Sequence, residues 1–264
     1  MLPYGLFSWV DLSAPDPKSA KEFYSQLFGW QTDDQLDTEG NYIYTLFRLD
    51  GRAVAGLGGQ SEELRKRGLP ACWTSYINVE SVDDSLALIK TFGGTVLMPG
   101  MDIMTAGRMG LASDPTGATF ALWQAGTHQG AGLFNAPGAL TWNELATRDL
   151  PAARRFYEQA LGWTFERAEG MTSEYYLIKL DTKVDGDHDA DDDFNGGLLA
   201  LDESWGELPS HWLVYFAVND TDEVASRAKG LGGRLTVEPF DETAGRIAII
   251  ADPQGGAFCV ITPS

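Results

Sequence analysis

The chain has 264 residues, of which 44% are hydrophobic, and its 38 acidic against 19 basic residues give a formal net charge of −19. This charge repels phosphate backbones and anionic lipid surfaces, so no nucleic acid and no membrane is expected as a partner. The apolar runs are far shorter than the roughly 18 residues of a membrane-spanning helix. The residues after Met1 lack the basic region of a signal peptide, and a cytoplasmic location is expected.

The first half predicts strands interrupted by two helices. Strand-like segments with many apolar residues are expected at 6–12, 42–49, 54–57 and 73–79. Asp16 before Pro17 is typical of a helix start, and Gly29 is expected to end that helix. A second helix, capped by Asp83, leads to two final strands joined by a tight turn at 114–117.

The opening strand and helix of the first half recur in the second half without a gap. Nine residues of the opening strand and helix recur 133 positions later: Trp9, Leu12, Asp16, Ala20, Phe23, Tyr24, Gln26, Gly29 and Trp30 return as Trp142, Leu145, Asp149, Ala153, Phe156, Tyr157, Gln159, Gly162 and Trp163. The closing Asp114-Pro115 turn and the preceding Ala-Gly-Arg also recur, with an offset of 138. Each half is predicted to contain the element order βαβββ twice, which indicates an α+β fold. The predicted organisation is a first module at 1–127, a linker at 128–137 and a second module at 138–264.

Two segments fall outside this repeat. The segment 125–137 is rich in Gly and Ala and predicts a surface connection. The insertion 185–195 contains alternating aspartates, a pattern compatible with calcium binding. However, an EF-hand loop needs Gly at its sixth position and Glu at its twelfth, where this chain has Ala190 and Gly196. A solvated loop is the alternative interpretation.

The two cysteines predict reduced thiols rather than a disulfide. Cys72 and Cys259 are the only cysteines, and they occupy non-equivalent places in the repeat. Cys259 has no His or Lys on its own strand to activate it, so inert burial is expected. His211, the equivalent of Cys72, has no counterpart that would support a role as general base.

The helix-opening Asp, the Phe-Tyr and Gly-Trp pairs and the closing Asp-Pro-x-Gly, all duplicated, resemble the vicinal oxygen chelate superfamily. This superfamily includes glyoxalase I, extradiol dioxygenases and bleomycin resistance proteins, and the chain is most similar to its tandem, actinobacterial type. The resemblance implies curved mixed sheets that enclose a cavity. Metal-dependent members hold a divalent ion there through His, Glu or Gln. One fold hosts many chemistries, so the resemblance does not fix the reaction.

The positions that the resemblance assigns to metal ligands do not carry a ligand set. The first ligand position falls on Trp9 and Trp142, and the last on Ala121 and Cys259. The intermediate position falls near Thr74 and Leu213. A divalent cation needs several converging oxygen, sulfur or imidazole donors, which Trp and Ala cannot supply. We therefore expect no metal and no cofactor.

The same comparison predicts an aromatic, acid-bearing binding site. If Trp9 and Trp142 face the cavity, strand alternation places Asp11 and Glu144 on that face too. Two indoles beside two carboxylates suit a flat organic ligand. The alternative is that both Trp fill the core and both acids bond to strand ends or turns. Further expected lining residues are Trp73, Tyr76, Trp212 and Tyr215, although strand aromatics are often ordinary core.

The repeated arginines have two possible roles. Arg108 and Arg246 would clamp a ligand carboxylate if they reach the cavity. Alternatively, each pairs with an acidic residue and holds the modules together.

Three functions follow from these expectations. The first is a metal-free protein that binds a small aromatic or carbonyl-bearing metabolite, for resistance, sequestration or assistance to a biosynthetic enzyme. The second is an enzyme of glyoxalase, lyase or hydroxylase type that uses Asp11 or Glu144 as general base, or a non-standard metal site. The third is an interaction protein whose cavity is filled. The chain is expected to be a monomer with paired modules or a homodimer.

Overall fold

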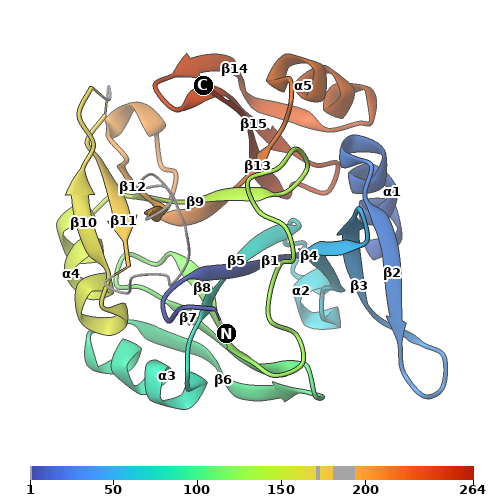
Figure 1. Cartoon of the computed structure of the whole chain (residues 1–264), viewed down its shortest axis with the longest axis horizontal. Coiled ribbons are helices and arrows are strands. Elements are labelled where there is room, and N and C mark those ends of the chain that lie inside the picture. Colours follow the sequence, from blue (N-terminus) through green and yellow to red (C-terminus); the bar gives the residue numbers. More distant parts are fainter. Residues whose placement is uncertain (1, 171–172, 181–193) are drawn as a thin grey trace. The chain divides into compact units, whose positions relative to one another are not determined.

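The computed structural model describes residues 2–170, 173–180 and 194–264 (Figure 1). The aspartate-rich stretch up to Asp193, with His188 and the calcium hypothesis, lies outside the described residues. In the first half the elements are β1 (Phe7–Ala14), α1 (Pro17–Phe28), β2 (Gln31–Leu36), β3 (Tyr42–Leu49), β4 (Arg52–Gly59), α2 (Glu62–Lys66), β5 (Cys72–Asn78), α3 (Val82–Thr91), β6 (Thr95–Ile103), β7 (Gly107–Ser113) and β8 (Thr119–Ala125).

The second half follows the same order. Its elements are β9 (Leu140–Thr147), α4 (Leu150–Leu161), β10 (Thr164–Arg167), β11 (Tyr175–Lys179), β12 (Phe194–Ala200), the 3₁₀ helix η2 (Glu203–Trp205), β13 (His211–Ala217), α5 (Thr221–Gly230), β14 (Arg234–Glu242), β15 (Gly245–Ala251) and β16 (Ala257–Pro263). The expected α+β class and the duplicated βαβββ pattern are confirmed.

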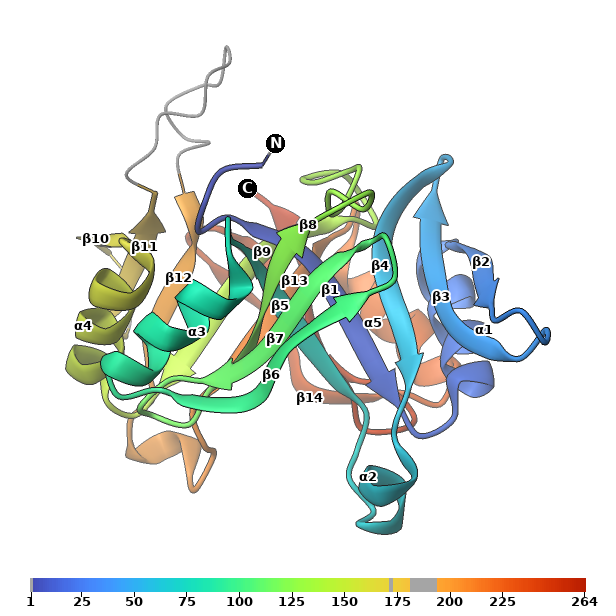
Figure 2. The same ribbon diagram turned by 90° about the horizontal axis from the view of Figure 1, so that it is seen from below.

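Each half forms one mixed eight-stranded sheet. The strand orders are β2-β3-β4-β1-β5-β8-β7-β6 and β10-β11-β12-β9-β13-β16-β15-β14. Within each βαβββ module the first strand pairs in parallel with the last, as Asp11 does opposite Gly56 and Glu144 opposite Gly197. Figure 2 shows one such module, with α3 packed across β6, β7 and β8.

The capping residues of the first helix in each half are those expected. The Asp16 carboxylate accepts from the backbone N–H groups at the start of α1, and Asp149 does the same for α4. Gly29 and Gly162 end these helices at φ of 74° and 70°, a left-handed conformation that glycine adopts without steric cost.

The cap expected for the second helix was wrong by two positions. Ser81 caps α3, and Asp220 caps α5, because these residues have the extended backbone that places a side-chain oxygen over the next N–H groups. Asp83 and Asp222 lie in the first turn instead, where each pairs with an arginine.

The chain folds into two compact units, each of which takes one βαβββ module from each half. Unit 1 contains Met1–Ser8, Ser75–Gly130 and Trp142–Trp212. Unit 2 contains Trp9–Thr74, Ala131–Thr141 and Leu213–Ser264. Within the units, α1 packs with α5 and α3 packs with α4, so helices from different halves of the sequence lie together. The compact units are therefore a different division of the chain from the two sequence repeats.

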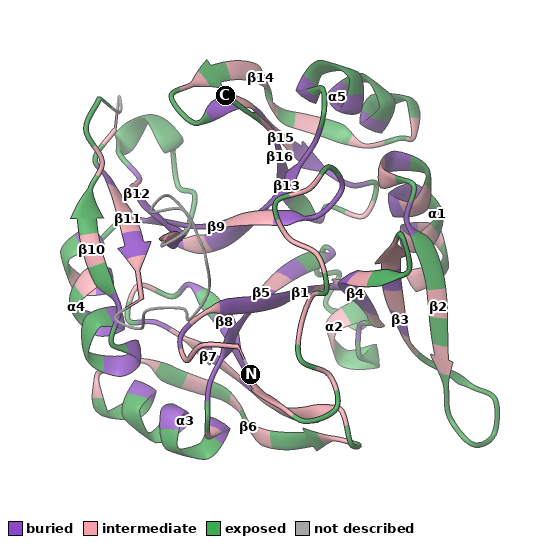
Figure 3. Ribbon diagram, in the orientation of Figure 1, coloured by how far each residue is buried: buried purple, intermediate pink, exposed green. Residues whose placement is uncertain are grey.

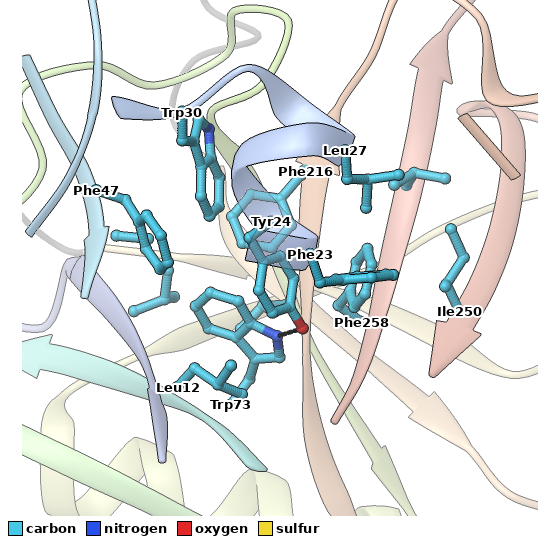
Figure 4. Close-up of a cluster of buried hydrophobic side chains, with 14 of the residues drawn as sticks. Leu12, Phe23, Tyr24, Leu27, Trp30, Phe47, Trp73, Phe216, Ile250 and Phe258 are labelled. Atoms are coloured by element: carbon cyan, nitrogen blue, oxygen red, sulfur yellow. Dashed lines mark hydrogen bonds between the residues drawn. The ribbon is translucent and has the colours of Figure 1, made fainter. Parts of the chain in front are cut away.

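The core of unit 2 is a cluster of aromatic side chains around Tyr24 (Figure 4). Tyr24 is fully buried, and the Trp73 ring meets it edge-on at 5.3 Å between centroids. The Trp73 Nε1–H donates to the Tyr24 hydroxyl at 3.0 Å, and that hydroxyl donates to Asp252 Oδ2 at 2.9 Å. Buried polar groups need such partners, because an unmade hydrogen bond costs more than a made one gains.

Unit 1 repeats this arrangement with equivalent residues. The Trp212 Nε1–H donates to the Tyr157 hydroxyl at 2.9 Å, and Tyr157 donates to Asp114 Oδ2 at 3.1 Å. Burial raises the pKa of Asp114 and of Asp252 above the ordinary aspartate value. The same burial raises the pKa of Tyr24 and of Tyr157 well above the ordinary tyrosine value, so both hydroxyls keep their protons.

The linker also contributes to the core of unit 2. Leu133, Phe134 and Ala136 pack against the apolar cluster, and Gly132 N–H donates to the Ala53 carbonyl at 2.8 Å. The segment therefore does more than connect two modules.

Figure 3 shows that α1 and α5 each have a buried and an exposed face, because buried and exposed residues alternate along each helix.

Candidate functional site

Strand alternation separates a core face from a second face on β1. Val10 and Leu12 are buried in the core cluster together with Tyr24 of α1. Trp9 and Asp11 therefore point to the opposite face. Both side chains reach one hydroxyl group there: Trp9 Nε1–H donates to the Tyr44 oxygen at 3.2 Å, and the Tyr44 hydroxyl contacts Asp11 Oδ2 at 3.2 Å as donor. We call Trp9, Asp11 and Tyr44 the first Trp-Tyr-acid cluster.

A glycine makes this contact possible. Tyr44 stands on β3 and Asp11 on β1, with β4 between them. The Tyr44 ring crosses β4 over Gly56, the residue directly paired with Asp11, and a Cβ atom at Gly56 would overlap the Tyr44 hydroxyl. Desolvation, followed by the negative charge of Asp11, raises the pKa of Tyr44 well above the ordinary tyrosine value. Tyr44 is therefore a protonated donor at physiological pH.

The second half builds the same arrangement on β11, β12 and β9. The Trp142 Nε1–H donates to the Tyr175 hydroxyl at 2.9 Å. A Cβ atom at Gly197 would overlap that hydroxyl, and Gly197 is the partner of Glu144 in the sheet register. We call Trp142, Glu144 and Tyr175 the second Trp-Tyr-acid cluster. The first cluster lies within unit 2 and the second within unit 1.

Four other aromatic residues expected at the site divide between the two faces. Trp73 and Trp212 are buried on the helix-facing side, bonded to Tyr24 and Tyr157. Tyr76 lies three positions after Trp73 on β5, and a separation of three puts the two side chains on opposite faces. Tyr215 is related to Trp212 in the same way on β13. Tyr76 packs edge-on against Trp123 at 6.3 Å between centroids.

The repeated arginines pair with acidic residues of their own module. Arg108 donates to Asp83 at 3.0 Å and 3.1 Å and to Asp102 at 2.8 Å. Arg246 bonds to Asp222, and to Asp241 at 3.0 Å. These bonds raise the pKa of both guanidinium groups further. Each arginine joins a helix start to a strand pair of its own module, whereas the sequence-based alternative expected the acid pairing to hold two modules together.

The residues at the family's metal-ligand positions do not fit a metal. Trp9 uses its only N–H on Tyr44, and Ala121 has no donor atom. Cys259 is buried and Thr74 is half-buried. Within residues 2–170, 173–180 and 194–264, no three His, Cys, Asp or Glu side chains are grouped as a cation would require.

The cysteines differ in accessibility. Cys72 is exposed, whereas Cys259 is fully buried, and neither forms a disulfide. Desolvation, and then the charge of Asp11, raises the pKa of the Cys72 thiol. His211 makes a 2.8 Å contact from Nδ1 to the Pro209 carbonyl. No helix among the described residues has the length and hydropathy needed to cross a membrane.

Sequence reasoning missed Tyr44, Tyr175 and the two glycines beneath them. A signal existed, because a tyrosine on one strand and a glycine on the next recur in both halves. Their offsets are 131 and 141 positions, which differ from the 133 of the opening helix because the connecting loops differ in length. A comparison at one fixed offset therefore does not align them.

Comparisons with known proteins show the family of this duplicated fold. The family model described as the Glyoxalase/Bleomycin resistance protein/Dioxygenase superfamily matches residues 6–122 and 139–260. The chain is 39% identical over 263 residues to "Putative glyoxylase CFP32" of Mycobacterium tuberculosis, covering 98% of this chain and 95% of the relative. It is 34% identical to "Anthracycline biosynthesis protein DauV" of Streptomyces sp. strain C5, with 97% and 93% covered.

Solved structures show the same fold at low identity. The Mn(II)-bound glyoxalase from Novosphingobium aromaticivorans superimposes with a TM-score of 0.64 at 15% identity, covering 98% of this chain and 82% of that one. At this identity the likeness extends to the fold alone.

Proposed function

Because the chain belongs to the Glyoxalase/Bleomycin resistance protein/Dioxygenase superfamily, we propose that it is a metal-independent binding protein for a small, flat, aromatic or carbonyl-bearing metabolite. The observation that carries the proposal is the duplicated Trp-Tyr-acid cluster. In both halves, a tryptophan at the family's first ligand position is hydrogen-bonded to a tyrosine. That tyrosine bonds to Asp11 in the first half, and in the second half it lies over Gly197, the strand partner of Glu144.

Each part of the cluster supports ligand binding. The half-buried rings of Trp142 and Tyr44 offer rigid surfaces for stacking, and a carboxylate adds a polar contact that fixes orientation. Trp9 is 4% exposed and supports the first cluster through its bond to Tyr44. The tyrosine hydroxyl anchors the indole N–H, so the ring is held in one position before a ligand arrives. Such preorganisation lowers the entropic cost of binding.

The relatives favour an aromatic ligand. The Streptomyces relatives bear names that assign them to anthracycline biosynthesis, and anthracyclines are flat, carbonyl-bearing aromatics. Within this proposal, the protein sequesters or delivers such a compound or assists an enzyme that modifies it.

Calorimetric titration of the full chain with a panel of flat aromatic compounds, anthracyclines included, tests this function. We expect dissociation constants in the micromolar range or below for one class, and Trp9→Ala and Trp142→Ala should each weaken binding at their own cluster at least tenfold. Trp205→Ala, at an exposed position on η2, is the matched control and should leave the affinity unchanged. Failure of every class to bind would contradict the proposal.

A second candidate function is a glyoxalase- or lyase-type enzyme, supported by the name of the mycobacterial relative. The half-buried Asp11 carboxylate, hydrogen-bonded by Tyr44, has the acceptor character of a general base. If turnover of an α-ketoaldehyde adduct is found, Asp11→Asn should reduce kcat at least a hundredfold. Unchanged turnover in both Asp11→Asn and Glu144→Gln would exclude this mechanism.

A further inference from the structure

Unit 1 contains a surface pocket of about 270 Å³ at the carboxyl end of α4. Its walls are Tyr4, Leu88 of α3, the residues 159–162 at the end of α4, and Leu180, which follows β11. The helices α3 and α4 pack against each other in this unit (Figures 1 and 2). None of these residues belongs to a Trp-Tyr-acid cluster, so the pocket is separate from the site described above.

The equivalent place in unit 2 holds a guanidinium group. Leu88 and Arg227 are both the seventh residue of a ten-residue helix, α3 and α5. Ala160 and Leu27 are both the eleventh residue of a twelve-residue helix, α4 and α1. Arg227 Nη1 donates to the Leu27 carbonyl at 3.0 Å, and its Nη2 bonds to Glu223. Unit 1 has a leucine where this arginine stands and therefore lacks the donor.

The acceptors of that donor are nevertheless present in unit 1. The last carbonyls of a helix have no N–H partner within it. The Ala160 carbonyl lies 3.5 Å from the Tyr4 hydroxyl, which is longer than the roughly 2.5–3.0 Å of an ordinary O–H···O bond. Asp84 takes the place of Glu223, four residues before Leu88 and on the same face of α3. Asp84 is exposed, and no ion pair within the described part of the chain includes it.

We infer that this pocket binds a small organic cation, an alkylguanidinium, whose charged group takes the place of the Arg227 guanidinium. The group donates to the Ala160 carbonyl and to the Asp84 carboxylate, as Arg227 donates to the matching acceptors of unit 2. A cation is also stabilised at the carboxyl end of a helix, which carries partial negative charge. This binding goes beyond the proposed function and uses other residues.

The pocket lining defines the rest of the ligand. Leu88, Leu161 and Leu180 offer apolar contact to a short alkyl chain. Burial raises the pKa of Tyr4, and the charge of Glu80 adds to this rise, so a second carboxylate acts on the pocket. A guanidinium suits two separate acceptors better than an ammonium, because its planar fork presents several N–H groups in fixed directions. An anionic ligand is disfavoured, because it would meet like charge.

Calorimetric titration of the full chain with n-butylguanidinium and with n-butylurea, its neutral isostere, tests the inference. We expect n-butylguanidinium to bind with at least tenfold higher affinity, because its hydrogen bonds are charge-assisted. Leu88→Arg should abolish this binding, because the new side chain occupies the acceptors as Arg227 does in unit 2. Leu36→Arg, which adds the same charge at another exposed leucine, on β2 in unit 2, is the matched control and should leave the affinity within about twofold.

A second variant keeps the inference testable if Leu88→Arg does not fold. Asp84→Asn changes only an exposed side chain, and it should weaken n-butylguanidinium at least threefold and leave n-butylurea unchanged. Equal affinity for the two probes, or no binding of n-butylguanidinium, overturns the inference. Undiminished binding in folded Leu88→Arg or in Asp84→Asn also overturns it. The panel of aromatic compounds decides the proposed function independently of all these outcomes.

Discussion

The Tyr24 hydroxyl donates to Asp252 Oδ2 at 2.9 Å across 228 positions of sequence, and so connects the first helix of the chain to its last tight turn. Tyr157 and Asp114 form the equivalent bond in unit 1 at 3.1 Å. Asp252 Oδ1 meanwhile accepts from the N–H groups of Gln254 and Gly256 within the turn. The Phe-Tyr motif of each half is therefore hydrogen-bonded to the Asp-Pro-x-Gly motif of the opposite half.

Removal of the Tyr24 hydroxyl should destabilise the protein strongly. Tyr24→Phe leaves the Trp73 N–H without this acceptor and Oδ2 of the buried Asp252 without the Tyr24 donor. Unfolding in urea should show a loss of about 2–4 kcal/mol, since each orphaned buried group costs about 1–3 kcal/mol. Tyr176→Phe, whose hydroxyl bonds to Glu174 at the surface, is the control and should change stability by less than about 0.5 kcal/mol.

Asp252 should make a contribution to stability that grows as pH falls. Burial raises its folded-state pKa above the ordinary 3.8, so the folded chain holds this proton more tightly than the unfolded chain. Its contribution is fully present below that ordinary value and is lost as pH rises through the raised pKa. The free energy of unfolding of wild type relative to Asp252→Asn should therefore increase as the pH is lowered from 7. A decrease would contradict this sign.

A side chain at Gly56 should disrupt the first cluster. Gly56→Ala would overlap the Tyr44 hydroxyl and force it away from Trp9 and Asp11. Denaturant unfolding should report a loss of about 1–3 kcal/mol, typical of overpacking, with loss of ligand binding at that cluster. Gly58→Ala is the matched control on the same strand, because its Cβ would make only an ordinary 3.7 Å contact with the Tyr44 ring. Equal effects of the two substitutions would show that Tyr44 tolerates displacement.

The arginines should prove dispensable for binding. All guanidinium bonds of Arg108 described above go to Asp83 and Asp102 of its own module. Arg108→Ala and Arg246→Ala should thus leave the dissociation constant of any bound ligand within about twofold in calorimetry. A tenfold loss confined to carboxylate-bearing ligands would instead assign a clamp role to these residues.

Asp11 should control the reactivity of Cys72 even without ligand. Its charge contributes to the raised pKa of that thiol, so Asp11→Asn should lower the pKa and increase the thiolate fraction at neutral pH. Stopped-flow labelling with a chromogenic disulfide should be faster in Asp11→Asn than in wild type. Asp37→Asn, an exposed substitution at a turn, should leave the rate unchanged.

The sequence predicted those parts of the fold that depend on local signals. The Asp16 and Asp149 caps, the Gly29 and Gly162 ends and the Asp-Pro turns need only neighbouring residues, and the structure contains them. Strand β2 gave no such signal, because its residues are exposed or half-buried at an edge and carry no apolar alternation. The offset repeat predicted the duplicated βαβββ order but did not reveal that the compact units combine modules from opposite halves.

The candidate site was harder to predict, because its key contacts cross three strands. Strand alternation alone predicts that Trp9 and Asp11 share one face of β1. Tyr44 reaches them only because Gly56 lies beneath its ring, a relationship that depends on sheet register. Strand alternation also predicts that Trp73 and Tyr76, three positions apart on β5, point to opposite faces of the sheet. The sequence alone therefore argued against placing both side chains in one site.

The bond between Tyr24 and Asp252 also constrains how the chain folds during synthesis. When the first βαβββ module leaves the ribosome, the residues that complete its core, such as Phe216 and Phe258, have not yet been made. Until Phe216 and Phe258 have been made, the apolar face of α1 lacks these two partners. The core of unit 2 is thus completed only when segments far apart in the sequence come together, and aromatic segments exposed before that step favour aggregation.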